Sequence, residues 1–177
     1  MGAMSPTFAT RWQIAQLNVG RMVAPVTAPE VADFMANLDP INALADASPG
    51  FVWRLQTDEG NATSVHAFPD PLLLLNMSVW ESIEALRAFT YTTAHTAVLR
   101  RRAEWFEKLA EAHLVLWWVP AGHIPTVEEA LERLERLRRE GPSPFAFTFR
   151  VPFEPDAAGP GEALVGAEFC WPEEIAV

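Results

Sequence analysis

The 177-residue chain has little cysteine and no long apolar run. Its single cysteine, Cys170, excludes an intramolecular disulfide and any metal site built from several thiolates. The longest apolar run, around residues 71–77, is far shorter than the roughly 20 residues of a membrane-spanning helix, and no basic segment followed by an apolar one opens the chain. We therefore expect a cytoplasmic protein with no membrane partner.

Positive charge is also scarce. The chain carries 13 lysines and arginines against 23 aspartates and glutamates, a net charge of −10, so its long-range field repels phosphate backbones. We expect no nucleic-acid partner. The sequence lacks a glycine-rich phosphate loop, a His-Glu-x-x-His motif and a Gly-x-Ser-x-Gly motif, and its four histidines lack the compact spacing of zinc ligands. We expect no metal site.

Apolar residues, by contrast, make up 50% of the chain. In a chain of 177 residues this content suffices for one buried core but is low for two. We expect a single domain over residues 11–151. Residues 1–10 begin with two closely spaced methionines and are interpreted as an expression remnant and a disordered N-terminus. Residues 152–177 are rich in proline, glycine and acidic side chains, and we expect this tail to be ordered only if Phe169 and Trp171 dock.

Hydrophobic periodicity predicts the secondary structure. The predicted strands are residues 11–19, 51–56, 72–80 and 113–119, with 63–68 as a candidate edge strand and 145–149 as a last short strand. The predicted helices are 31–45, broken in two at Asp39-Pro40, then 82 to about 111, and 127 to 140. Ser82 and Thr126 are residue types that cap a first helical turn, and Gly141 ends the last helix.

This order of elements predicts an α+β fold. A β-α-β-β-α-β sequence is typical of the ferredoxin-like antiparallel sheet with its helices on one face, here followed by an extra helix and strand. The other face of the sheet still carries Leu, Val, Met and Trp side chains, which would be exposed to water in a single copy. We therefore predict a homodimer.

His95 is the first candidate for a functional residue. Its neighbours at helical spacing in the expected long helix are Tyr91, Val98, Leu99, Arg102 and Phe106. A partly desolvated imidazole with a lowered pKa is a usable neutral base, or a ligand for a metal or haem iron. The same position also suits a core histidine satisfied by one hydrogen bond, and spacing does not separate the two. Arg102, on the same stripe, must find a carboxylate, a bound anion or solvent.

Aromatic and polar residues on the strands complete the candidate set. The tryptophans of the expected domain are Trp12, Trp53, Trp80, Trp105, Trp117 and Trp118, which suit either a core and dimer interface or a pocket wall. The consecutive Trp117 and Trp118 must point to opposite faces of their strand. Asn18, Arg54 and Asn76 each need a partner if buried. Asn18 shares a face with Trp12, so it is either a substrate-orienting amide or a structural tie.

Several segments together resemble the domain-of-unknown-function 3291 family. They are residues 16–18, 39–46, 48–55, 78–82, 95–96, 101–106 and 116–123, and the resemblance extends over roughly residues 14–150. It implies the dimeric α/β-barrel superfamily, whose members include cofactor-independent antibiotic-biosynthesis monooxygenases, haem-degrading monooxygenases and isomerases. In the haem-degrading members an Asn on the first strand, a Trp ending the third and a His on the second helix form the site. Asn18, Trp80 and His95 occupy similar places, with a longer separation between Trp80 and His95.

The cofactor-independent members use the same residue types to hold an electron-rich substrate that reacts with oxygen itself. The resemblance therefore favours a monooxygenase-like enzyme acting on an apolar or aromatic small molecule in a pocket between sheet and helices. We expect His95 to be catalytic, without a cofactor, or to bind haem in a haem-dependent variant. The expected substrate-binding residues are Asn18, Trp80, Arg54, Tyr91, Arg102 and Trp118. The open alternatives are a non-enzymatic dimeric module that binds a small molecule or haem, and a purely structural dimeric domain.

Overall fold

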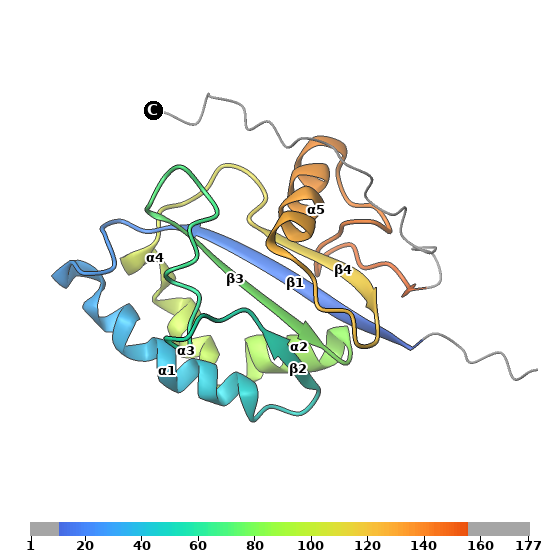
Figure 1. The fold of residues 1–177 in the computed structure, drawn as a ribbon, viewed down its shortest axis with the longest axis horizontal. Helices are drawn as coiled ribbons and strands as arrows, with labels where there is room; N and C mark the ends of the chain where they lie inside the picture. The colour runs from blue at the N-terminus through green and yellow to red at the C-terminus, as the bar shows by residue number, and fades with distance from the viewer. Residues whose placement is uncertain (1–10, 156–177) are drawn as a thin grey trace, which may run out of the picture.

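A computed structural model describes residues 11–155 of the chain. Four strands, β1 (Trp12–Arg21), β2 (Phe51–Arg54), β3 (Leu73–Trp80) and β4 (Leu114–Pro120), form one antiparallel sheet in the order β2-β3-β1-β4 (Figure 1). In the register of the central strand β1, Ile14 lies opposite Trp80 of β3 and Trp118 of β4, and Asn18 lies opposite Asn76. This strand order confirms the predicted ferredoxin-like α+β fold.

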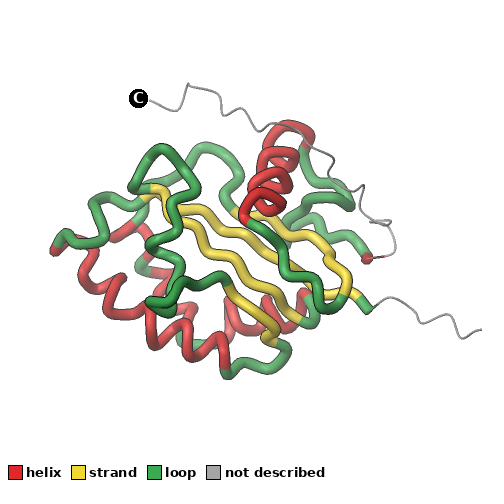
Figure 2. Tube along the Cα trace, viewed as in Figure 1, coloured by secondary structure: helices red, strands yellow, loops and turns green. Residues whose placement is uncertain are grey.

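The connections are helical. η1 (Pro29–Val31) and α1 (Ala32–Asp46) join β1 to β2, whereas α2 (Ile83–Thr92), α3 (His95–Arg100) and α4 (Arg102–Trp105) join β3 to β4. The extra helix α5 (Val127–Glu140) follows β4 and lies across the sheet on the side opposite to α1 and α2, as the tube trace in Figure 2 shows. No helix of residues 11–155 is long and apolar enough to span a membrane.

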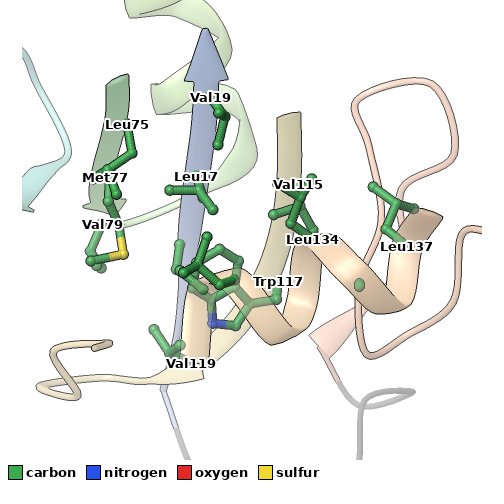
Figure 3. Packing of buried hydrophobic residues seen from close by; sticks show 14 residues of the cluster. Leu17, Val19, Leu75, Met77, Val79, Val115, Trp117, Val119, Leu134 and Leu137 are labelled. Atoms are coloured by element: carbon green, nitrogen blue, oxygen red, sulfur yellow. The ribbon is translucent and has the colours of Figure 1, made fainter. Parts of the chain in front are cut away.

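The larger hydrophobic core lies between the sheet and α5 (Figure 3). Alternate side chains of the strands, among them Leu17, Val79 and Trp117, are fully buried there. The apolar stripe of α5 covers one half of this face with Ala130, Leu131, Leu134 and Leu137. The loop between β2 and β3 packs against the same cluster with Val65, Ala67 and Phe68.

This burial corrects one expectation. The sheet face that was expected to be exposed to water in a single copy is covered by α5 and the β2–β3 loop of the same chain. The reason lies in α5, which is not part of the β-α-β-β-α-β unit and packs on the face that the unit leaves open. The prediction of a homodimer was based on an uncovered apolar face, and that basis no longer holds. The homodimer stays a prediction.

The helix 31–45 differs from its predicted form. It was expected in two pieces, but α1 runs without interruption through Pro40. A proline removes the N–H that would bond to the carbonyl four residues earlier, here that of Ala36. Both Ala36 and Pro40 lie on the exposed side of the helix, where water can bind the freed carbonyl, so the helix continues.

The expected helix from Ser82 to Glu111 is also different, because it is divided into α2, α3 and α4 and ends at Trp105. Threonine side chains cause the first break. The Thr93 hydroxyl donates to the Phe89 carbonyl (2.6 Å) and accepts the backbone N–H of His95 (3.2 Å), while Thr93 itself is extended (φ −107°, ψ −177°). Such hydrogen bonds offer the backbone an alternative to the helix. His95 consequently begins a new helix.

Two strand predictions were wrong and three cap predictions are confirmed. Residues 63–68 form a loop, and 145–149 form isolated bridges instead of a strand; the bridge of Phe147 with Leu116 of β4 is the one that joins them to the sheet. Ser82 accepts the N–H of Ala85, and Thr126 accepts that of Glu129. α5 ends at Gly141, whose φ of +79° suits a residue without a Cβ. The expectations for residues 1–10 and for Phe169 and Trp171 lie outside the described residues.

Candidate functional site

A cavity of about 530 Å³ lies between the sheet and the helices α1 and α3. Its floor is polar and comes from the central strands, with Gln16, Asn18, Asn76 and Ser78. Its walls are mostly apolar and come from the helices, with Phe34, Leu38, Ile41, Phe89, Val98 and Leu99. Apolar walls around a few convergent polar groups are typical of a small-molecule site.

The polar floor is partly connected by hydrogen bonds. The Gln16 Nε2 donates to Asn76 Oδ1 (2.8 Å) and to Ser78 Oγ (3.0 Å), and the same Ser78 oxygen accepts the Trp80 indole N–H (2.9 Å). These bonds hold the buried Trp80 ring and the Asn76 amide in place. Asn18, directly opposite Asn76, has no side-chain hydrogen bond to any described residue, so its amide is available to a ligand.

His95, at the start of α3, combines one occupied and one free ring nitrogen. Its Nδ1 lies 3.3 Å from the Thr90 carbonyl oxygen, which can only accept, so Nδ1 carries the proton and Nε2 the lone pair. Within residues 11–155 Nε2 has no hydrogen-bond partner. The imidazole packs against Phe89 (4.8 Å between ring centroids), which in turn stacks on Trp80 (5.0 Å).

Burial lowers the pKa of His95, and the bond to the Thr90 carbonyl only partly opposes this effect. The ring is therefore neutral near pH 7 and carries a fixed tautomer. A neutral imidazole with one anchored nitrogen is the arrangement of a general base. The Thr93 break that restarts the helix at His95 is what brings the ring into contact with Phe89, six residues earlier.

Arg102, the first residue of α4, contacts a histidine instead of a carboxylate. Its Nη1 lies 3.0 Å from His113 Nε2, and because a guanidinium only donates, His113 accepts and is neutral. Burial lowers the pKa of both groups, and the Arg102 charge lowers that of His113 further. Both side chains line the cavity, together with Phe106.

The structure brings most of the predicted site residues around this one cavity. Arg54 lines it but is held by Asp46 at 2.7 and 3.1 Å and by the Gly60 carbonyl at 2.8 Å. Tyr91 lies at the edge, 53% exposed. Trp118 does not line the cavity, because its indole N–H donates to the Phe153 carbonyl (2.6 Å). Its expected place in the substrate site is therefore not supported by the geometry.

The site residues that sequence reasoning missed include Gln16, Ser78, Phe89 and His113. Strand alternation contained the signal for Gln16 and Ser78, which lie two residues before Asn18 and Trp80 on the same sheet face. Phe89 lies on the apolar stripe of α2 with Ile83 and Leu86, so helical spacing contained its signal as well. His113 lies in coil just before β4 and had no such signal.

The residues that could hold a metal or cofactor are few. No group of three or more His, Cys, Asp or Glu side chains suited to a metal ion occurs among the described residues. His95 fits the axial ligand of haem iron, because its Nδ1 bonds to a backbone carbonyl and its Nε2 has no hydrogen-bond partner in the part of the chain that the structure describes.

Comparisons with known proteins give distant structural matches and a family match. No curated protein matches the chain. SnoaB, a cofactor-independent oxygenase from Streptomyces nogalater, is 15% identical with a TM-score of 0.36, covering 66% of this chain and 97% of that one. A monooxygenase from Streptomyces coelicolor, solved with the ligand nanaomycin D, is 17% identical with a TM-score of 0.40, covering 66% and 95%. A protein of unknown function from Nitrosomonas europaea is 16% identical with a TM-score of 0.40, covering 67% and 99%.

The family match covers most of the chain. The family described as "Domain of unknown function (DUF3291)" matches residues 13–162. Among the described residues, this range includes the helices, the four strands except the first residue of β1, Trp12, and every residue named above as lining the cavity. The chain belongs to the DUF3291 family.

Proposed function

We propose that this protein is an enzyme that binds an apolar or aromatic small molecule in the 530 Å³ cavity and removes a proton from it with Nε2 of His95. The observation that carries the proposal is the hydrogen bonding and protonation of the His95 imidazole. Its Nδ1 is anchored by the Thr90 carbonyl, its pKa is lowered by burial, and its free Nε2 belongs to a cavity-lining residue. A base of this kind is neutral at the pH where it must act.

The other lining residues suit the same reaction. Loss of a proton leaves a negative charge on the substrate, and the free amide of Asn18 can donate to the oxygen on which that charge gathers. The stacked rings of Phe89 and Trp80 line the cavity and give an apolar or aromatic substrate a surface to pack against. The proton itself moves to His95, which becomes an imidazolium.

A monooxygenase reaction without a cofactor follows naturally from this step, with molecular oxygen as the oxidant. The electron-rich anion reduces oxygen, and the overall change converts a substrate CH₂ and one O₂ into a C=O and one water. One oxygen atom enters the carbonyl, and the other leaves with the two hydrogens. The support for this finer assignment is the presence of Asn18, Trp80 and His95 at the places where cofactor-independent members of the resembled superfamily have these residue types.

The experiment separates proton removal from oxidation. The probe is 2-tetralone, an aromatic ketone with an acidic CH₂, and its exchange into D₂O is followed by NMR under nitrogen. We expect the protein to accelerate exchange and His95→Gln to abolish the acceleration, whereas His66→Gln, at an exposed histidine, leaves it unchanged. Bound probe with equal exchange in the His95→Gln variant would refute the base, and binding without any exchange would favour a non-enzymatic binding module.

A haem-dependent variant rests on the same nitrogen. Haem held by Nε2 of His95 would supply oxygen activation at the iron, and Arg102 would provide a cation in the same cavity for a propionate. Addition of hemin then produces a Soret band shift in the native protein and not in the His95→Ala variant. An unchanged hemin spectrum in the native protein would exclude the haem-dependent reaction and leave the cofactor-free one.

A further inference from the structure

The cavity holds one cation without a counter-ion. Arg102 and Arg54 both line it, but Arg54 is paired with Asp46, whereas no carboxylate of the described residues lies within ion-pair distance of Arg102. A shortage of carboxylates does not explain this, since the chain has a net charge of −10. The adjacent Arg101 binds both Asp33 and Glu104 at 2.8 Å.

The hydrogen-bond partner that Arg102 does have brings no negative charge. His113 accepts a single N–H from Arg102 through Nε2, and the ring is neutral. Among the described residues the structure gives no acceptor for the other four N–H donors of the guanidinium, whose central carbon lies 5.8 Å from the centroid of the Phe106 ring. Arg138 donates to the Ala112 carbonyl and is paired with Glu111 at 3.5 Å, and its charge also lowers the pKa of His113.

Leaving a half-buried guanidinium without a charge partner costs free energy. Desolvation lowers the pKa of Arg102, and no neighbouring carboxylate of the described residues opposes this effect. An incoming carboxylate would remove the cost and form two parallel N–H···O bonds with the planar fork.

We propose that Arg102 binds the carboxylate of the substrate, so that the molecule taken by this cavity is an apolar or aromatic carboxylic acid. This inference rests on the proposed function and names its substrate class. Arg102 begins α4 and follows His95, which begins α3, by seven residues. The apolar Val98 and Leu99 line the cavity between them. The acid group is therefore held at one end and the ring system extends along the apolar wall toward His95.

The test compares two probes that share a ring system and differ in charge. Isothermal titration measures 2-naphthoate and 2-naphthamide against the native protein and three variants: Arg102→Gln, Arg102→Lys and the exposed Arg100→Gln as control. We expect the native protein to bind naphthoate at least about tenfold more tightly than naphthamide, which is about 1.4 kcal/mol. Arg102→Gln removes that preference without changing naphthamide binding, Arg102→Lys keeps part of it, and Arg100→Gln keeps all of it.

The native protein alone decides the question if the Arg102 variants do not fold. Equal affinity for the two probes would overturn the carboxylate site while the pocket itself stands. A naphthoate preference that persists in Arg102→Gln would likewise overturn it. If neither probe binds, the pocket of the proposed function fails and the carboxylate site with it.

Discussion

Truncation of Leu134 to alanine tests whether α5 closes the sheet within one chain. Leu134 is 2% exposed and packs in the cluster that also holds Leu17 and Trp117 (Figure 3). Replacement of a buried leucine by alanine costs about 2–5 kcal/mol through lost burial and the cavity left behind. Leu134 lies at the middle of the stripe that α5 presents to the sheet, so we expect about 3 kcal/mol. For a chain of this size that is a fall in Tm of roughly 6–12 °C.

Urea unfolding followed by tryptophan fluorescence measures this change, because Trp117 lies in the affected cluster. Arg139→Ala, on the exposed side of α5, is the control and should change the free energy of unfolding by less than about 1 kcal/mol. A loss below about 1 kcal/mol for Leu134→Ala would refute the packing of α5 on the sheet. The face would then be free for a second copy, and sedimentation would test the predicted homodimer against a 19.7 kDa monomer.

Two further predictions concern the polar groups beneath and beside the cavity. Burial lowers the pKa of His95 and His113, so the folded protein binds fewer protons than the unfolded chain; the resulting stability is complete above about pH 6.5 and is lost as the pH falls below it. Urea unfolding between pH 7.5 and 5.5 should show this fall, with a shallower slope in His95→Gln, and a flat profile would contradict it. Ser78→Ala leaves the Trp80 indole N–H without its acceptor and should cost about 1–3 kcal/mol in thermal unfolding. Ser143→Ala is the matched control, because the buried Ser143 hydroxyl has no hydrogen-bond partner among the described residues and its removal should be neutral or stabilising.

Local patterns were sufficient for much of the fold. Strand alternation and apolar runs of strand length predicted the four strands of the sheet to within a few residues. The side chains of Ser82 and Thr126 marked two helix starts that the hydrogen bonds confirm. These features depend on residues close together in the chain, where period and capping chemistry act directly. The stripe of α5 was predictable for the same reason.

Part of the candidate site was predictable as well. Residues such as Asn18, Arg102 and His95 stood out because each is a polar side chain in an apolar pattern, and the structure places them around one cavity. Their roles in binding and catalysis stay predictions. Trp118 is the predicted site residue that does not line the cavity. Its aromatic character alone did not show whether the ring lines a pocket or packs against other residues of the chain.

By itself the sequence determined the element types, the order that defines the ferredoxin-like sheet, and the polar residues that its core would have to accommodate. Only the tertiary structure decided that α5 and the β2–β3 loop cover the second face, which removed the reason for a dimer. It also decided that the Thr93 break turns His95 toward Phe89, and that Arg102 faces the neutral His113. The physical reason is common to all three: each depends on contacts between elements, and hydrophobic periodicity records which side of an element is buried but not what buries it.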